Sequence, residues 1–319
     1  MIDEEYRALT EGAGLVDFSH RTRIEVTGDD RASFLHNLTT NDVKGLSAGG
    51  GCEAFLLDTR GHVVGHVFLI SIAERRSIVI ETVAGENERL LGHLNRYLIR
   101  EKVELHDRGQ EWGELLLAGA KSAAAIAALS MSDLPADRLA NSTLEVAGQM
   151  VTIVRVELTP TGGYLLLTAT PGAQRIVTEA LREQGAVVCG PEAFEAARIR
   201  AGFPIYGRDV NDKNLPQEVD RNDLAISFRK GCYLGQETVA RIDALGHVNK
   251  TLVRLRFAGP VAPPTGTELV AGEVEVGQVT SAAFSPLDQA SFALAYVRRG
   301  SNQPNATLSS NMGPAVILD

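Results

Sequence analysis

The chain has 319 residues and a mass of 34.2 kDa, with 44% apolar and 22% charged residues and a net charge of −9 at neutral pH. This length provides for one large domain or two ordinary ones with a substantial buried core, which excludes a disulfide-stabilised miniprotein and a coiled rod. The acidic balance argues against general nucleic-acid binding. No apolar run approaches eighteen residues and the first five residues are rich in acid, so we expect a cytoplasmic protein without a membrane span or a targeting peptide.

Residues 22–107 alternate between the periodicities of strands and helices. The pattern predicts strands at 23–26, 52–57, 62–70, 77–83 and 103–106, and helices at 31–38 and 86–99. Between the second and third of these strands, Thr59, Arg60 and Gly61 predict a hairpin turn. Because the elements do not follow a regular βαβα repeat, they favour an α+β layer arrangement.

Residues 115–201 repeat this style. The pattern predicts strands at 115–117 and 164–169, a hairpin over 144–158 that turns near Gly148, and helices at 121–129, 173–184 and 192–201. After about Lys250 the helical pattern ends, and strands at 251–257, 274–281 and 291–298 alternate with glycine and proline, which predicts a small β-barrel or sandwich. We therefore expect two domains, residues 1–245 with two α+β lobes and residues 246–319 with the barrel.

Cysteine spacing and charge distribution bear on the kind of ligand. The cysteines are Cys52, Cys189 and Cys232, and they form neither a CxxC pair nor a set with nearby histidines, so no resident metal site is predicted. Residues 198–256 hold eleven basic and seven acidic residues, a local charge of +4 on an acidic protein. This stretch predicts a small anionic ligand, with a solvated basic face as the equal alternative.

The most informative segment is residues 229–241, with the sequence RKGCYLGQETVAR. Two glycines in it flank a cysteine and a tyrosine, so the backbone can approach a ligand closely or adopt positive φ. Lys230 stands two residues before Cys232, which in an extended loop places both on the same side, and a neighbouring ammonium favours the thiolate. If Gln236 and Glu237 begin a helix, its free N–H groups can hold an anion. A tight turn with a buried, unreactive thiol is the alternative.

This segment resembles the Lys-Gly-Cys-Tyr-x-Gly-Gln-Glu signature of the folate-binding YgfZ proteins, relatives of the glycine-cleavage aminomethyltransferases and of mitochondrial iron–sulfur assembly factors. Other stretches resemble the same superfamily in the same order and together span nearly the whole chain. They are residues 14–20 (GLVDFSH), 34–43 (FLHNLTTNDV), 198–204 (RIRAGFP), 206–209 (YGRD), 215–218 (LPQE), 277–281 (GQVTS) and 293–297 (ALAYV).

The resemblance implies a GcvT-like α+β fold with three lobes. Two α+β lobes would surround a central tetrahydrofolate channel, and a C-terminal β-barrel would close one side. The function implied is that of a folate-binding accessory protein that supports assembly or repair of iron–sulfur clusters through Cys232, with tetrahydrofolate or a derivative as cofactor. We expect a maturation factor rather than an aminomethyltransferase. Its partners would be iron–sulfur client or assembly proteins, with neither nucleic acid nor a membrane.

The site that this family implies centres on Cys232, as a transient thiolate or sulfur ligand, and on Lys230, as its electrostatic activator. These two are the expected catalytic residues, and no residue is expected to hold a metal. The expected cofactor-binding residues shape the loop, orient the ligand or contact an anion. They are Gly231, Tyr233, Gly235, Gln236, Glu237, Arg241, Arg200 and Glu218.

Two departures from the aminomethyltransferases bear on activity. Those enzymes carry an aspartate early in the helix after a Val-x-Asn-Ala strand, whereas Leu90 stands at that position here, and leucine cannot transfer a proton. They also place a glutamate against the pterin where this chain has Arg200. Glu195 or Glu218 would have to replace that glutamate.

Two other functions stay open. One is a genuine folate-dependent one-carbon (aminomethyl) transferase that uses another carboxylate, such as Glu86 or Glu88. The other is a scaffold protein that has kept the fold and lost folate binding, which the charge reversal at Arg200 favours. Turnover of tetrahydrofolate with an aminomethyl donor would favour the first, and absence of tetrahydrofolate binding would favour the second.

Overall fold

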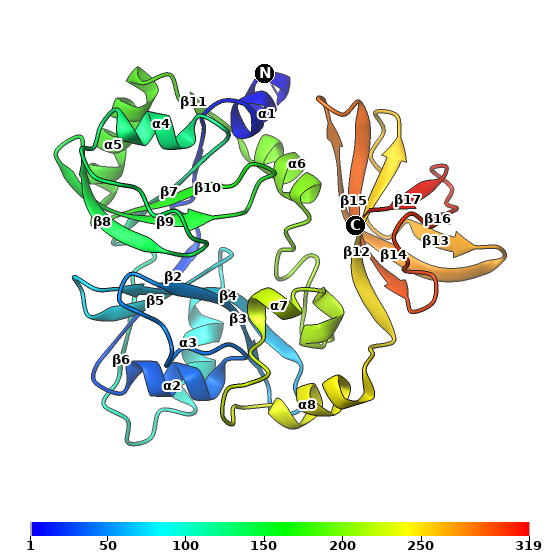
Figure 1. The fold of residues 1–319 in the computed structure, drawn as a ribbon, viewed down its shortest axis with the longest axis horizontal. Helices are drawn as coiled ribbons and strands as arrows, with labels where there is room; N and C mark the ends of the chain where they lie inside the picture. Colours follow the sequence, from blue (N-terminus) through cyan, green and yellow to red (C-terminus); the bar gives the residue numbers. More distant parts are fainter. Residues whose placement is uncertain (1, 319) are drawn as a thin grey trace.

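The computed structural model describes residues 2–318, and its three sheets divide the chain into two lobes and a barrel (Figure 1). The first lobe combines a five-stranded antiparallel sheet with two helices. In spatial order its strands are β3 (Gly51–Leu57), β4 (Val63–Ile72), β5 (Ser77–Thr82), β2 (Thr22–Thr27) and β6 (Glu104–Asp107), and its helices are α2 (Arg31–Leu38) and α3 (Asn87–Asn95). Leu35 of α2 and Leu90 of α3 are fully buried in one core with the sheet.

The second lobe is a six-stranded sheet with helices on both faces. In spatial order its strands are β11 (Val187–Val188), β1 (Gly14–Asp17), β7 (Gly113–Ala118), β10 (Gly163–Thr168), β9 (Gln149–Val156) and β8 (Asn141–Val146), and its helices are α1 (Ile2–Thr10), α4 (Ser122–Ala127), α5 (Pro171–Glu183) and α6 (Pro191–Ala201). Strand β1 pairs with β7 and β11 of this lobe. The first strand in the sequence therefore belongs to the second lobe, and the strands of the first lobe follow it in the chain.

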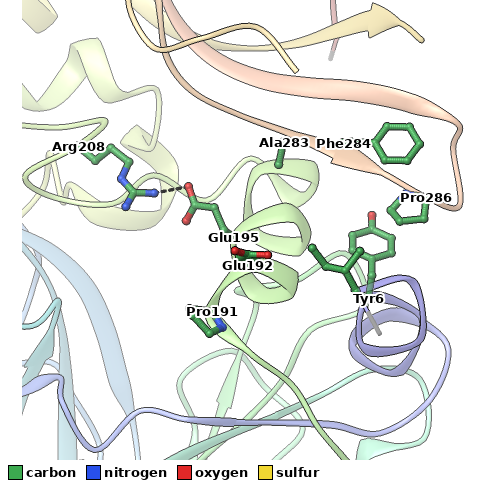
Figure 2. A pocket seen from close by; sticks show the side chains of 9 residues that line it. Tyr6, Pro191, Glu192, Glu195, Arg208, Ala283, Phe284 and Pro286 are labelled. Carbon is green, nitrogen blue, oxygen red and sulfur yellow. Dashed lines mark hydrogen bonds and ion pairs between the residues drawn. The ribbon is translucent and has the colours of Figure 1, made fainter. Parts of the chain in front are cut away.

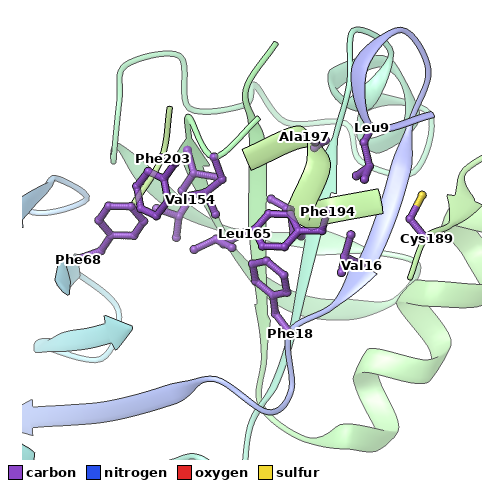
Figure 3. Packing of buried hydrophobic residues seen from close by; sticks show 14 of the residues in the cluster. Leu9, Val16, Phe18, Phe68, Val154, Leu165, Cys189, Phe194, Ala197 and Phe203 are labelled. Carbon is purple, nitrogen blue, oxygen red and sulfur yellow. The ribbon is translucent and has the colours of Figure 1, made fainter. Parts of the chain in front are cut away.

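The two lobes share a hydrophobic core (Figure 3). Phe68 of β4 packs against Phe203, with ring centroids 5.9 Å apart. Phe18, which follows β1, meets Phe194 of α6 edge to face at 5.0 Å. Since these rings come from both lobes and from the segment after α6, burial of aromatic surface fixes the three segments against one another.

A linker joins the lobes to the barrel and contains the short helices η1 (Pro216–Val219), α7 (Asn222–Ala225) and α8 (Gln236–Leu245). In spatial order the barrel strands are β13 (Glu268–Ala271), β14 (Val274–Ser285), β15 (Ala290–Arg298), β12 (Lys250–Ala258), β17 (Ala315–Ile317) and β16 (Thr307–Leu308). Val270 and Ser309 exchange two backbone hydrogen bonds of 2.8 Å, which nearly closes the barrel. The predicted α+β fold with a C-terminal barrel is confirmed. The domain division at residue 245 stays a prediction.

The helices are short and lie close to their predicted positions. α2 covers the predicted residues 31–38, whereas the predicted helix 86–99 ends at Asn95. Beyond it, the N–H groups of Tyr97 and Leu98 donate to carbonyls three residues back, and this tighter turn ends the α-helix. Within residues 2–318, none of the helices combines the length and the apolar composition that crossing a membrane requires.

Candidate functional site

A cavity of about 660 Å³ lies where the two lobes meet α6 and the linker. Small-molecule sites occupy roughly 300–1,000 Å³, so this space suits a ligand of ordinary size. Its wall is formed by β1 and the loop after it, the loop between β5 and α3, the start of α6 and the beginning of the linker. The lining residues are Val16, Asp17, Phe18, His20, Arg21, Val83, Ala84, Glu86, Cys189, Pro191, Phe194, Glu195, Ile205, Tyr206, Gly207 and Arg208. We call this space the channel cavity.

Asp17, at the end of β1, is a firmly held carboxylate in the wall of the channel cavity. It accepts hydrogen bonds from the backbone and the hydroxyl of Ser19 at 2.9 and 2.5 Å and from Gln174 at 3.0 Å. Burial alone would raise the pKa of Asp17, but these hydrogen bonds outweigh it and keep the pKa below its usual value. Asp17 therefore presents a fixed negative charge at neutral pH.

Glu86 and Tyr206 line the same cavity and are joined through Arg89. Glu86 directly precedes α3 and pairs with Arg89, whose guanidinium lies 4.7 Å above the Tyr206 ring. Burial raises the pKa of Tyr206, so its hydroxyl remains protonated at neutral pH. Phe18 and Phe194 add two more rings to the wall. The cavity thus combines an oriented carboxylate with three aromatic side chains.

A narrow pocket continues from the channel cavity toward the centre of the molecule. It shares Arg21, Val83 and Tyr206 with the channel cavity and has a volume of about 10 Å³. That is roughly the space of one water molecule or one amino group. Its other lining residues are His66, Val67, Phe68, Glu81, Thr82, Phe203 and Pro204. We call this space the interior pocket.

The interior pocket ends at an aromatic and ionic cluster around Phe203. The Phe203 ring stacks on His66 at 5.6 Å and lies 5.1 Å from the guanidinium of Arg221. His66 and Arg221 both bind Glu53, a fully buried carboxylate on β3 that also pairs with Arg138 of the second lobe. Burial favours protonation of Glu53, but Arg221 and His66 outweigh it and hold the pKa of Glu53 well below its usual range. Glu53 therefore ties both lobes and the linker together.

A further cavity of about 420 Å³ lies between the linker and the barrel, and we call it the barrel cavity. Its wall includes Asp220, Arg221 and Arg254. Burial, followed by the charge of Asp223, raises the pKa of Asp220. The barrel cavity and the interior pocket share no lining residue, so they are separate spaces.

A further, largely apolar cavity of about 440 Å³ adjoins the channel cavity, and an ion pair lies in its wall (Figure 2). Glu195 of α6 and Arg208 of the linker line both cavities and pair with each other. Glu195 also pairs with the buried Arg198, so two guanidinium groups fix its carboxylate. Beyond this pair, the Tyr6 hydroxyl lies 2.9 Å from Ser285 Oγ and connects α1 to the barrel.

Cys232, the predicted catalytic thiol, is exposed on the loop before α8 and does not line the channel cavity. The ammonium of Lys230 donates to the backbone carbonyls of Thr39 at 2.6 Å, Asn41 at 2.8 Å and His36, at the end of α2. Burial lowers the pKa of Lys230 to about 8. Among the described contacts none joins Lys230 to Cys232, so the visible role of the lysine is to anchor the loop. Activation of the thiol stays a prediction.

The rest of this loop packs against the β3–β4 turn. Helix α8 begins at Gln236, as predicted, and Gly235 before it has a φ of +77°. A Cβ on Gly235 would lie 2.6 Å from the backbone oxygen of Asp58, so glycine is required for the two turns to meet. Tyr233 is buried, whereas the remaining predicted residues of the segment are exposed: Gly231, Glu237 and Arg241.

Arg200 and Glu218 also lie away from the channel cavity. Arg200 donates to Asp288 at 2.8 Å and lies 4.5 Å from the Phe292 ring, so it joins α6 to the barrel. Glu218 accepts a hydrogen bond of 3.1 Å from Asn214 and closes η1. Both side chains have protein partners, and their contact with a folate stays a prediction.

The structure shows which of the carboxylates considered in the sequence analysis line the channel cavity. Leu90 is fully buried in the core of the first lobe, so no acid reaches the cavity from that position. Glu86 and Glu195 line the channel cavity, whereas Glu88 is exposed and does not. Only Glu86 of these combines a place in the cavity with a single guanidinium partner, Arg89.

Several cavity residues were missing from the predicted site, among them Asp17, Arg21, Glu81 and Tyr206. Asp17 and Tyr206 lie in stretches that resemble the superfamily, but nothing local indicates that they share one cavity. For Glu81 a signal existed, because it is a carboxylate in a strand, SIVIET, whose residues are all buried. A charged residue at a buried strand position needs a partner or a function.

Two family models match the chain. The model for the GCVT N-terminal domain matches residues 1–230, and that for the glycine cleavage T-protein C-terminal barrel domain matches residues 250–315. An aminomethyltransferase of Thermus thermophilus is 30% identical over 304 residues, covering 95% of this chain and 84% of the relative. A putative chloroplastic transferase of Arabidopsis thaliana is 29% identical over 303 residues, covering 93% and 68%.

A solved structure shares the fold of the whole chain. The glycine cleavage system aminomethyltransferase T from Bartonella henselae superposes with a TM-score of 0.88 at 20% identity, covering 99% of this chain and 88% of that one. At this identity the likeness shows the fold alone. The predicted GcvT-like arrangement is thereby confirmed, and the finer resemblance to YgfZ proteins is not resolved by these similarities.

Proposed function

This chain belongs to the glycine cleavage T-protein family, and on that premise we propose that it binds tetrahydrofolate in the channel cavity and transfers a one-carbon unit there. The aminomethyltransferases of the family use tetrahydrofolate. Relatives named aminomethyltransferase favour a transferase over the maturation factor expected from the sequence. The observation that carries the proposal is Glu86, an oriented carboxylate in the wall of a cavity with three aromatic rings.

The residues of the channel cavity fit a folate. A pterin ring is flat and carries N–H donors, so it needs aromatic walls and acceptors, which Phe18, Tyr206 and Asp17 supply. The glutamate tail of a folate is anionic and pairs with guanidinium groups. Arg208 offers one in the channel cavity, and it belongs to the basic stretch 198–256.

The chain's own residues supply the groups that proton transfer needs. When bound, tetrahydrofolate supplies the ring nitrogen that accepts the one-carbon unit. Glu86, held by Arg89, takes up or holds a proton at its carboxylate during that transfer. Tyr206 keeps its hydroxyl protonated and can donate a hydrogen bond in the same cavity. In this proposal Glu86 replaces the aspartate that the family carries where this chain has Leu90.

The test compares two neighbouring carboxylates of the same loop and helix. With tetrahydrofolate and an aminomethyl donor, we expect E86Q to lose turnover by about 100-fold or more while still binding tetrahydrofolate in calorimetry. E88Q is the matched control, because Glu88 is exposed and does not line the cavity. Turnover by E86Q at the wild-type rate, or no turnover by the wild type, would contradict the proposal.

A second candidate is the YgfZ-type role, in which a folate-binding accessory protein supports iron–sulfur cluster assembly or repair through Cys232. Exposure of this sulfur on a loop anchored by Lys230 favours it, because a client or assembly protein can reach the thiol. In a strain that lacks the protein, C232A would then fail to restore cluster enzymes and E86Q would succeed. The reverse outcome supports the transferase, and a wild type that binds no tetrahydrofolate supports a scaffold.

A further inference from the structure

Four charged side chains form a buried cluster next to the interior pocket. Arg21 pairs with Glu81 of β5, and Arg23 of β2 donates to Glu114 of β7 at 2.8 Å. All four are less than a tenth exposed. The guanidinium of Arg23 also donates to four backbone carbonyls at 2.8 to 3.2 Å, those of Phe18, Ser19, Gly109 and Trp112. The cluster therefore joins the two lobes through ion pairs shielded from water.

One oxygen of each carboxylate in this cluster lacks a partner. Glu81 Oε2 and Glu114 Oε1 accept no hydrogen bond from the described residues, although both side chains are fully inaccessible to solvent. Buried acceptors of this kind are rare in folded proteins, and each calls for a proton, a water or a ligand. Glu81 and Glu114 differ in which of these three partners is available to the unpaired oxygen.

A proton accounts for the unpaired oxygen of Glu114. Burial, followed by the charge of Glu81, raises the pKa of Glu114 to about 7, so this carboxyl group is neutral for much of the time at neutral pH. Glu114 lines none of the cavities described above. Glu81, in contrast, lines the interior pocket, so a donor can lie beside its free oxygen.

We propose that Glu81 is a ligand-binding residue whose free oxygen accepts a hydrogen bond from the exocyclic amino group of a planar heterocycle in the channel cavity. That this heterocycle is the pterin of a folate rests on the proposed function. The interior pocket, at about 10 Å³, has room for an amino group and not for a ring. Arg21 holds the other oxygen of Glu81 and fixes its orientation.

The shared walls of the two spaces explain how one ligand reaches both. Val83 and Tyr206 line the channel cavity and the interior pocket, so a ring packed against them can extend its amino group toward Glu81. An ionised acceptor binds such a donor more strongly than a neutral one. A ring without the amino group would leave Glu81 Oε2 unpaired, and sites built this way reject the analogue that lacks the donor.

Calorimetric titration of the wild type, E81Q and E114Q with tetrahydrofolate and with its 2-desamino analogue tests this role. We expect the wild type to bind tetrahydrofolate at least about tenfold more tightly than the analogue. E81Q should bind tetrahydrofolate about tenfold more weakly and lose most of this discrimination. E114Q is the matched control from the neighbouring ion pair, and it should bind both compounds as the wild type does.

The outcomes separate this role from the proposed function. Wild-type affinity and discrimination in E81Q would overturn the role of Glu81 while leaving folate binding intact. A wild type that binds neither compound would remove the proposed function and this inference with it. Should E81Q fail to fold, the R21M/E81M variant replaces the ion pair by apolar side chains of similar size, and retained discrimination in that variant would overturn the role.

Discussion

The channel cavity and the loop that carries Cys232 are built in opposite ways. The loop is a contiguous motif, and its visible contacts are those of packing: Lys230 donates to carbonyls at the end of α2, and Gly235 meets the β3–β4 turn. The cavity draws on segments from residue 16 to residue 208, which share no motif. It nevertheless holds the oriented carboxylate and the aromatic wall that a ligand needs.

The difference teaches that a dense motif and a ligand site need not coincide. The glycine and the lysine of the loop meet requirements of the backbone: Gly235 permits a positive φ, and Lys230 binds carbonyl groups. A cavity is assembled by topology, so its residues are dispersed along the chain. The exposed sulfur of Cys232 faces solvent, where a partner protein can reach it, whereas Glu86 lines the channel cavity and Glu81 lines the interior pocket.

The largest effect on stability is expected at Glu53, whose ion pairs join the two lobes and the linker. Replacing Glu53 by Gln removes the fully buried carboxylate that pairs with the partly buried Arg221 and Arg138, which should lower the free energy of unfolding by about 3–5 kcal/mol. Urea denaturation measures this loss. E157Q is the matched control: Glu157 also pairs with Arg138, but its side chain is 56% exposed, and we expect a change below about 1 kcal/mol. Equal effects of the two variants would show that Glu53 does not hold the lobes.

A smaller effect, confined to the loop, is expected on replacing Lys230 by Met. This change removes three charge-assisted hydrogen bonds to carbonyls at and just after the end of α2, and it should destabilise the loop by about 2–3 kcal/mol. Hydrogen exchange should then rise at residues 227–235 and at the end of α2, with tetrahydrofolate affinity unchanged. K44M, at an exposed lysine nearby, serves as control. Loss of folate affinity in K230M would mean that the loop and the cavity form one site.

The pH dependence of stability tests the protonation of Glu114, in the buried charged cluster beside the interior pocket. The pKa of Glu114 is raised to about 7 by burial and by Glu81, so between about pH 4.5 and 7 the folded protein holds a proton that the unfolded chain releases. The free energy of unfolding should therefore fall as pH rises through this window, by about 3 kcal/mol relative to E114Q, and level off above it. Urea denaturation of both proteins at several pH values checks this. A constant difference between them would contradict a protonated Glu114.

The smallest effect on stability is expected at Cys232. Because its side chain is exposed, C232A should change the free energy of unfolding by less than about 0.5 kcal/mol. Burial raises the pKa of Cys52 and of Cys189 to about 12, so a thiol reagent should label one cysteine quickly in the folded protein and all three after unfolding. Slow labelling of Cys232 would indicate that the loop closes over its sulfur.

Much of the fold could be predicted from the sequence, because helices, hairpins and the barrel leave local patterns. The helix at residues 31–38 and the turn near Gly148 are examples, and both lie where expected. The pairing of β1 with the second lobe left no such pattern, since one short apolar strand can join either sheet. The same holds for Arg200, whose partner Asp288 comes from the barrel, 88 residues away.

The candidate site was harder to predict than the fold. The sequence indicates Glu86 as an alternative carboxylate, because it stands near the position that Leu90 occupies. It does not indicate Glu81, because the environment of Glu81 depends on contacts with Arg21 and on an interior pocket that only tertiary structure creates. A charged residue within an otherwise apolar strand is therefore the sequence feature that would have improved the prediction of the site.

The most direct measurement is a crystal structure of the complex with tetrahydrofolate, grown without oxygen. We expect the pterin ring in the channel cavity beside Tyr206, with its amino group at Glu81 and its reactive nitrogen near Glu86. A folate bound instead against the Cys232 loop, with the channel cavity free of ligand, would contradict the central claim.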